Sequence, residues 1–274
     1  MKNLHTILAA AFCGAIFTLG VAVSAQPVQP GFATVDHVEG IASYSLGDGN
    51  WHPLVAGKIL AAGAIIRTGE NGVVDVILGK TLSVPASVPG ALPTGNPTSA
   101  DSAVRGMATY NPKIEQNVIR LSPNSTLAVD KLTVTDTGAD TVNDTELDLQ
   151  KGDIFFKVKK DTAASQYLIK IPNGVAAIRG TEGHMGADGR ASCHSSTHGG
   201  FLISITTKNG ATQTFEITPG NMLVNPASGQ IEAIPPQLQA IFNQVFQILV
   251  FLAGKTTTAT ITSNNGTTIV ISSY

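Results

Sequence analysis

The chain has 274 residues, of which 13% are charged, and its formal net charge is −2. Because Lys and Arg are few and not clustered, the chain lacks the positive surface that phosphate binding requires, and nucleic acid is excluded as a partner. The 28 glycines and abundant Thr and Val favour an extracytoplasmic β protein over a cytosolic enzyme.

The first residues have the order of a cleavable secretory signal peptide. Lys2 precedes an apolar stretch over residues 7–23 that ends on small residues. We expect cleavage after Ala25, which removes residues 1–25 and places the mature chain in the periplasm or outside the cell. An uncleaved membrane anchor is the alternative, but the apolar stretch is short for a span. We expect no transmembrane span after cleavage.

Short β-prone runs separated by turn residues fill the chain between residues 34 and 234, which we interpret as one β domain. Five prolines interrupt the series within residues 80–113, so no ladder can run through this segment and we expect a surface insertion there. About a dozen strands predict an all-β fold, either a β-sandwich or a β-roll of many short strands. Strand spacing alone does not exclude a barrel or a short solenoid.

Residues 236–254 depart from the β pattern, because apolar side chains recur there at helical spacing after two prolines. We expect one C-terminal apolar helix packed on the β domain, with a membrane-surface or partner-binding helix as the alternative. The last segment, residues 255–274, is expected to form a terminal β-hairpin around Asn264-Asn265-Gly266. Such a hairpin can add to a sheet in this molecule or in another one.

Several stretches of the chain carry a resemblance to a known family. They are Trp51-His52-Pro53-Leu54, Arg67-Thr68-Gly69, Ile119-Arg120-Leu121-Ser122-Pro123-Asn124-Ser125, Gly152-Asp153-Ile154 and Ile171-Pro172-Asn173-Gly174-Val175-Ala176-Ala177-Ile178-Arg179-Gly180-Thr181. Together they resemble the FecR-like domain of bacterial extracytoplasmic proteins, over residues 38–224. The last stretch resembles the family's pattern most specifically.

The resemblance implies a regulatory role, because the best-known members sense an outer-membrane transporter from the periplasm and control a cytoplasmic sigma factor. This chain shows no cytoplasmic anti-sigma segment before its apolar stretch, so control of a sigma factor is not carried over. What the resemblance implies is an exported FecR-like domain with a binding or sensing role.

Arg179, Gly180 and Thr181 lie in the most specific stretch and are candidate ligand-binding or structural residues. An arginine beside the apolar Ile178 is expected to pair with a carboxylate, for which Asp153 is a candidate, or to cap main-chain carbonyls. Arg179 then either locks two strands together or contacts a ligand. Neither role is catalytic.

Metal-ligating residue types gather between residues 183 and 200. Cys193, His194 and His198 are the metal candidates, since thiolates and imidazoles bind soft metals, and His184 lies close to them in sequence. The richness in Gly, Ser and Ala favours a flexible loop with incidental histidines, so we do not expect a metal site. Cys193 is the one thiol left after signal cleavage, and we expect it to be buried.

The sequence contains no motif of a catalytic site. A GxSxG elbow, a phosphate loop, a dinucleotide fingerprint and a paired zincin motif are all absent. We therefore expect a non-catalytic protein without a cofactor, which binds or senses an envelope protein or a glycan. The alternative is a structural or self-assembling envelope protein that uses the C-terminal helix and hairpin.

Overall fold

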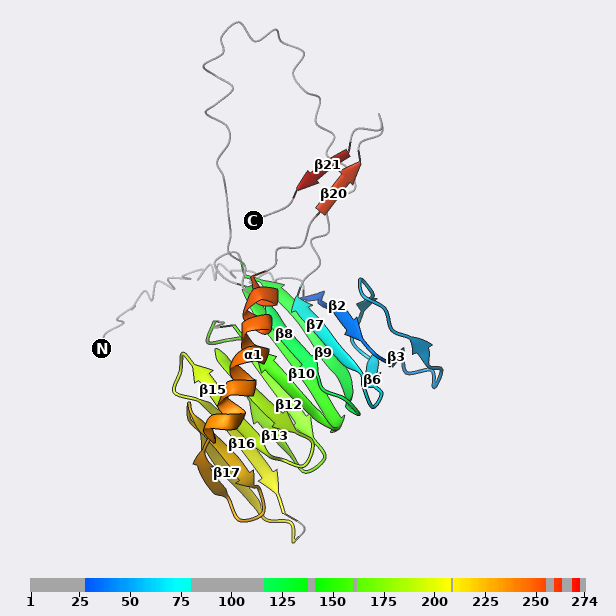
Figure 1. The fold of residues 1–274 in the computed structure, drawn as a ribbon. Coiled ribbons are helices and arrows are strands. Elements are labelled where there is room, and N and C mark those ends of the chain that lie inside the picture. Colours follow the sequence, from blue (N-terminus) through cyan, green and yellow to red (C-terminus); the bar gives the residue numbers. More distant parts are fainter. Residues whose placement is uncertain are drawn as a thin grey trace, which may run out of the picture.

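The computed structural model describes residues 28–79, 116–137, 141–159, 162–207 and 209–254, and the backbone of two further strands at 259–262 and 268–271. The described residues form two large β-sheets that share a core, and one helix lies outside one of the sheets (Figure 1). This arrangement confirms the predicted all-β fold with one C-terminal helix.

Sheet A contains ten of the described strands. In chain order they are β1 (Val28–Pro30), β3 (Ala42–Ser45), β4 (His52–Pro53), β6 (Ile65–Thr68), β9 (Thr126–Asp136), β10 (Thr141–Lys151), β12 (Gln166–Ile171), β13 (Gly174–Ala177), β16 (Phe201–Thr206) and β17 (Thr212–Ile217). Their order across the sheet is β17-β16-β13-β12-β10-β9-β6-β3-β4, with β1 paired to β9.

Sheet B contains nine of the described strands. They are β2 (Phe32–Glu39), β5 (Ile59–Leu60), β7 (Val73–Gly79), β8 (Asn117–Leu121), β11 (Asp153–Lys157), β14 (Thr181–Gly186), β15 (Ala191–Ser196), β18 (Asn221–Asn225) and β19 (Gln230–Ala233). Their order is β19-β18-β15-β14-β11-β8-β7-β2-β5.

The chain crosses repeatedly between the two sheets. Strands β10 and β12 are parallel neighbours in sheet A because β11, which lies between them in sequence, belongs to sheet B. From β12 onward, the hairpins β12–β13 and β16–β17 of sheet A alternate with the hairpins β14–β15 and β18–β19 of sheet B. The molecule therefore has the two facing sheets of a sandwich and the winding of a roll.

The inner faces of the two sheets share one hydrophobic core. Buried and more exposed residues alternate along strands such as β12 and β16, as expected for a sheet with one face in the core. Phe156 of β11 and Phe201 of β16 meet across the sandwich in an edge-to-face contact, with ring centroids 5.8 Å apart. Burial of one such ring stabilises the fold by about 1.5–3 kcal/mol.

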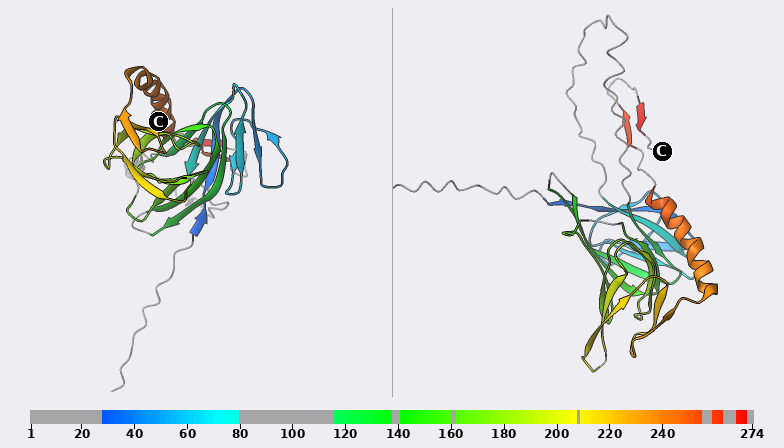
Figure 2. Two further views of the ribbon diagram at one scale, coloured as in Figure 1. Left: turned by 90° about the horizontal axis from the view of Figure 1, so that it is seen from below. Right: turned by 90° about the vertical axis from the view of Figure 1, so that its left-hand side faces the viewer.

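Sheet B also has an apolar patch on its outer face, and helix α1 (Pro236–Ala253) covers it (Figure 2). Val118 of β8 and Phe155 of β11 contribute to this patch. The helix contributes the buried side chains Phe242, Phe246, Leu249, Leu252 and Ala253. This packing confirms the prediction of an apolar helix that lies on the β domain.

The ends of α1 follow from the sequence. Pro236 stands at the start of the helix, where its missing N–H leaves no hydrogen bond unmade. At the other end, the N–H of Gln116 donates to the carbonyl of Ala253 at 3.1 Å, which ties the helix to the start of β8. With 18 residues, α1 is long and apolar enough by length and composition alone to cross a membrane, a property that core helices of soluble proteins share.

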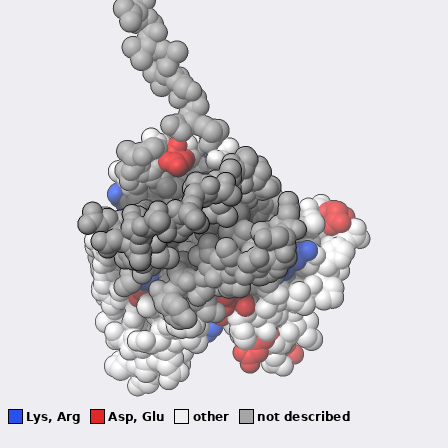
Figure 3. Space-filling view, turned by 90° about the horizontal axis from the view of Figure 1, so that it is seen from above, with Lys and Arg blue, Asp and Glu red and all other residues white. Residues whose placement is uncertain are grey.

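Charged side chains form pairs across neighbouring strands, and one of them, Asp75, is buried. The Asp75 carboxylate receives two hydrogen bonds from the guanidinium of Arg120, both at 2.7 Å, across the pairing of β7 with β8. Lys157 and Glu182 form a similar pair between β11 and β14, at 2.7 Å. On the face shown in Figure 3, the Lys and Arg side chains of the described residues occur singly and form no continuous basic patch.

Parts of the predicted organisation fall outside the described residues. These are the predicted signal peptide at residues 1–25 and the predicted proline-rich insertion at residues 80–113. The terminal hairpin is described in its two strands, β20 (Ala259–Thr262) and β21 (Thr268–Ile271), which pair antiparallel as predicted.

The shared core predicts a large cost for its truncation. We expect Phe156→Ala to lower the free energy of unfolding by about 3–5 kcal/mol, because the change removes a fully buried ring and leaves a cavity. Urea denaturation of the purified protein measures this loss. Leu202→Ala is the matched control, because Leu202 is 50% exposed and its truncation should change stability by about 0.5 kcal/mol or less. Equal losses in the two variants would contradict the assignment of Phe156 to the core.

Candidate functional site

Three of the stretches that carry the family resemblance meet at one corner of the molecule. The hydroxyl of Thr68 donates to the carbonyl of Ser122 at 2.6 Å and accepts from the N–H of Ser125 at 2.9 Å. The hydroxyl of Ser125 in turn bonds both main-chain groups of Asp153 at 2.9 Å. These buried hydroxyls satisfy main-chain groups where the chain changes direction, so this part of the pattern encodes the fold.

Gly180 and Thr181 lie where the chain passes from β13 in sheet A to β14 in sheet B. Gly180 has a φ of +59°, a conformation that side-chain-bearing residues rarely adopt. The buried Thr181 hydroxyl lies 3.2 Å from the Ser196 hydroxyl and donates to the Arg179 carbonyl at 3.1 Å. Both residues shape the crossing between the sheets.

The predicted ion pair between Arg179 and Asp153 is wrong. Arg179 is exposed after the end of β13, whereas Asp153 begins β11 and its carboxylate lies 3.1 Å from Nε2 of His184 on the neighbouring β14. The hydrogen bond from His184 lowers the pKa of the Asp153 carboxyl, and the partial burial of Asp153 opposes this shift. The register of β11 against β14 selects this partner, and sequence distance gave no sign of it.

The prediction of a flexible loop between residues 183 and 200 is also wrong, because most of this segment forms the paired strands β14 and β15. Cys193 is buried in the core between the sheets, as predicted. His194 stacks instead on Phe246 of the helix, and His198 lies in an exposed turn after β15. The three metal candidates therefore do not converge, and no group of three metal-ligating residues occurs in the part of the chain that the structure describes.

The environment of Cys193 makes it a poor nucleophile and a poor metal ligand. Burial raises the pKa of its thiol to about 12, and the negative charge of Glu182 acts in the same direction. Thiolate chemistry requires a deprotonated sulfur, so Cys193 stays a protonated core residue at ordinary pH.

Two histidines of sheet B help to hold α1 in place. The His194 ring stacks on Phe246 at a centroid distance of 4.6 Å, and the His184 ring stacks on Phe242 at 5.7 Å. Phe155 touches both phenylalanines edge to face. The members of this aromatic cluster come from three strands and one helix, and no short motif joins them, so sequence patterns do not reveal it.

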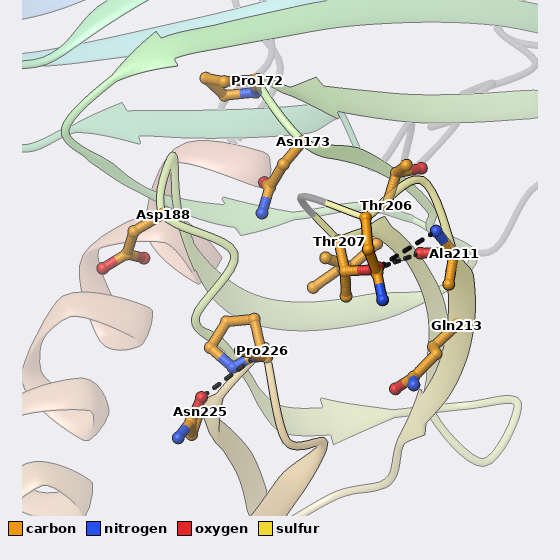
Figure 4. Close-up of a pocket in the computed structure, with 12 residues that line it drawn as sticks. Pro172, Asn173, Asp188, Thr206, Thr207, Ala211, Gln213, Asn225 and Pro226 are labelled. Atoms are coloured by element: carbon orange, nitrogen blue, oxygen red, sulfur yellow. Dashed lines mark hydrogen bonds between the residues drawn. The ribbon is translucent and has the colours of Figure 1, made fainter.

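A cavity of about 880 Å³ lies where hairpin turns of the two sheets come together (Figure 4). It is lined by residues of the β12–β13 turn (Pro172, Asn173), the β14–β15 turn (Asp188), the β16–β17 hairpin (Ile205, Thr206, Thr207, Asn209, Ala211, Gln213) and the β18–β19 turn (Asn225, Pro226, Ala227). Two of these hairpins belong to sheet A and two to sheet B, so the alternate crossing of the chain builds this cavity.

The main chain of these turns is already hydrogen-bonded within and between the turns. The N–H of Thr206 donates to the carbonyl of Asn173 at 2.7 Å, and the N–H of Thr207 donates to the carbonyl of Ala211 at 2.8 Å. In the β18–β19 turn, the N–H of Gly229 donates to the carbonyl of Asn225 at 2.9 Å. The cavity therefore offers mainly side-chain amides and hydroxyls to a bound molecule.

Asn173 has an unmet hydrogen-bonding group. Its side-chain oxygen is buried and has no donor among the described residues. Figure 4 shows its amide extending from the β12–β13 turn into the space beside Thr206 and Pro226. The sequence analysis assigned this residue to the family pattern but gave no sign of the cavity, because the four turns are far apart in sequence.

The Asp153 contact predicts a pH dependence of stability. The pKa of Asp153 in the folded protein lies below its usual value of 3.8, so its ionised form stabilises the fold above that pH, and this contribution is lost as the pH falls through the folded pKa. We expect Asp153→Asn to lose less unfolding free energy than the wild type between about pH 6 and about pH 3.

Urea denaturation across this pH range measures the effect. Glu39→Gln, at an exposed position, controls for the removal of one carboxylate. Identical acid sensitivity of Asp153→Asn and the wild type would show that the His184 contact does not stabilise the fold.

Comparison with known proteins finds a family similarity over part of the chain. The family model described as FecR protein matches residues 112–200, a narrower span than the predicted 38–224, and no curated protein matches the chain. Two crystal structures of a candidate anti-sigma factor from Parabacteroides distasonis align with 14% and 13% identity and a TM-score of 0.31 each. The alignments cover 47% and 48% of this chain and 57% of each of those chains. Over residues 112–200, the chain is similar to the FecR protein family model.

Proposed function

We propose that this protein is an exported, non-catalytic binding or sensing module of the bacterial envelope, and that the cavity between the four hairpin turns receives its partner. The observation that carries the proposal is the lining of this cavity, which consists mainly of amide, hydroxyl and apolar side chains held on a rigid sandwich. Turn residues positioned by a rigid scaffold are a common arrangement for recognition.

The titratable groups beside helix α1 and in the core do not favour catalysis. The Asp153–His184 pair packs against the aromatic rings under α1, and the hydroxyl of the nearby Ser192 is itself buried. Cys193 faces the core with a raised pKa. Neither the Asp153–His184 pair nor Cys193 therefore combines a general base with an accessible nucleophile.

Export is supported by the pattern of residues 1–25, and the family resemblance supports an envelope location. The partner in this proposal is an envelope protein or a glycan. A chain that senses such a partner needs a preformed recognition surface more than a reactive group, and the four turns provide one.

The proposal is tested with the full chain, expressed in a bacterial host and recovered from its envelope fraction. Mass spectrometry of the recovered protein should show a chain that begins at Gln26. Recovery of an uncleaved chain from the cytoplasm would contradict export.

Capture of a partner from envelope extract should depend on the cavity. We expect Gln213→Arg to abolish capture, because the longer charged side chain enters the space that Gln213 lines. Thr214→Arg is the matched control, since Thr214 lies next to it on β17 and is exposed but does not line the cavity. Equal capture by the wild type and by Gln213→Arg would overturn the cavity as the recognition site.

Self-association through α1 is a second candidate function. Ile241 and Ile248 lie one heptad apart on the helix, with exposed fractions of 53% and 41%. Apolar side chains repeated along one exposed side of a helix are typical of a contact with a second copy.

If α1 mediates assembly, the wild type should be an oligomer and Ile241→Gln/Ile248→Gln should be a monomer by light scattering. Asn243→Ser/Gln247→Ser is the matched control, because these exposed residues lie on a polar side of the same helix. A monomeric wild type would rule out assembly through this face.

A further inference from the structure

We propose that the cavity between the four hairpin turns binds an uncharged saccharide chain. This inference rests on the proposed function and names the chemical class of its ligand. Charge, hydrogen-bonding capacity and shape each support it.

The first support is the charge of the lining. Of the twelve described residues that line the cavity, Asp188 alone is ionisable. Its carboxylate lies 2.6 Å from Nε of Arg190, which compensates its charge. A phosphate, sulfate or carboxylate ligand would find no cation among the described lining residues. A cationic ligand would find the one carboxylate of the described lining, that of Asp188, already paired with Arg190. The described lining therefore favours a neutral ligand.

The second support is the kind of hydrogen-bonding group. The amides of Asn173 and Gln213 each offer both donors and acceptors. The Thr207 hydroxyl already donates to the carbonyl of Ala211 at 2.8 Å, so it offers a ligand only its acceptor lone pairs. Sugar hydroxyls donate and accept at every position, so they complement such a set. The unmet oxygen of Asn173 is one site where a ligand hydroxyl can donate, after a turn of the amide.

The same groups argue against an extended peptide. A peptide that adds to a sheet binds through unpaired main-chain groups of an edge strand. Thr206 pairs with Thr212 across the β16–β17 hairpin, and the turns bond internally through Thr207 and Ala211. Strand β17 ends sheet A, so a peptide could pair only with its outer edge. The hydrogen-bonded turns inside the cavity leave a peptide few main-chain partners, whereas a saccharide needs none.

The third support is shape. Ile205, Pro172 and Pro226 place apolar surface beside the amides, and such surface suits the C–H faces of sugar rings. The volume of about 880 Å³ is within the range of about 300–1,000 Å³ that is typical of ligand sites. The cavity can therefore hold more than one sugar ring.

The test uses isothermal titration of the full exported protein with a defined panel of tetrasaccharides. The neutral probes are maltotetraose, cellotetraose, laminaritetraose and chitotetraose, and tetragalacturonate is the anionic comparison. Lys208 lies outside the described residues but falls in sequence between two lining residues, Thr207 and Asn209. Because a lysine attracts anions, the anionic probe tests whether the site prefers a charged saccharide. We expect at least one neutral probe to bind at a single site and tetragalacturonate not to bind.

Variants then locate the site. We expect Gln213→Ala to weaken binding of the neutral probe by about tenfold, the effect of losing one or two hydrogen bonds. Thr214→Ala, on the outer side of the same strand, should bind like the wild type. Thermal unfolding of both variants confirms that they fold, so that a loss of binding reports on the cavity.

The outcomes separate this inference from the proposed function. Absence of binding by all four neutral probes, or preference for tetragalacturonate, overturns the saccharide assignment. If a captured envelope protein depends on Gln213 and a neutral probe does not displace it, the proposed function stands and the saccharide inference fails. If neither capture nor saccharide binding depends on Gln213, both fail.

Discussion

Sheet B carries an apolar patch on its outer face in addition to its core face, and the rest of the structure depends on this constraint. Its inner face packs on sheet A, with Phe156 against Phe201, while Val118 and Phe155 lie in a second apolar cluster on the outer face. Water must be excluded from both faces, so the chain supplies a second layer on one side and a helix on the other. The helix is held in place by burial of its apolar side chains and by stacking of His194 on Phe246. The same stacking covers the His194 ring, which the sequence offered as a metal ligand.

The same constraint leaves one end of the sandwich for the proposed recognition site. Helix α1 covers the apolar patch of sheet B, and the polar groups that line the cavity belong to the hairpins and their turns. The chain crosses between the sheets after each hairpin, which brings turns from both sheets to one cavity near Asn173 and Gln213. The family pattern contributes the Pro172–Asn173 turn to this cavity, and later strands contribute the remainder.

The two errors of the sequence analysis have physical reasons. The segment around Gly183 has the small and polar residues of a loop, but Gly183 is needed in a strand, since a Cβ there would lie 2.6 Å from Cζ of Phe156. Close approach of a core ring requires glycine, and composition cannot distinguish that need from flexibility. Asp153 was assigned to Arg179 by charge alone, whereas the register of β11 and β14 brings His184 next to it.

The sequence by itself determined the all-β class, the boundaries of α1 and the FecR pattern, because periodicity, proline and glycine positions and short motifs act over a few residues. The burial of Cys193 also followed from the sequence. Tertiary structure alone decided the partner of Asp153, the stacking of histidines on α1 and the cavity. Each of these three features depends on contacts between residues far apart in the chain. Strand order and register set those contacts, so none of the three features has a local sequence signal.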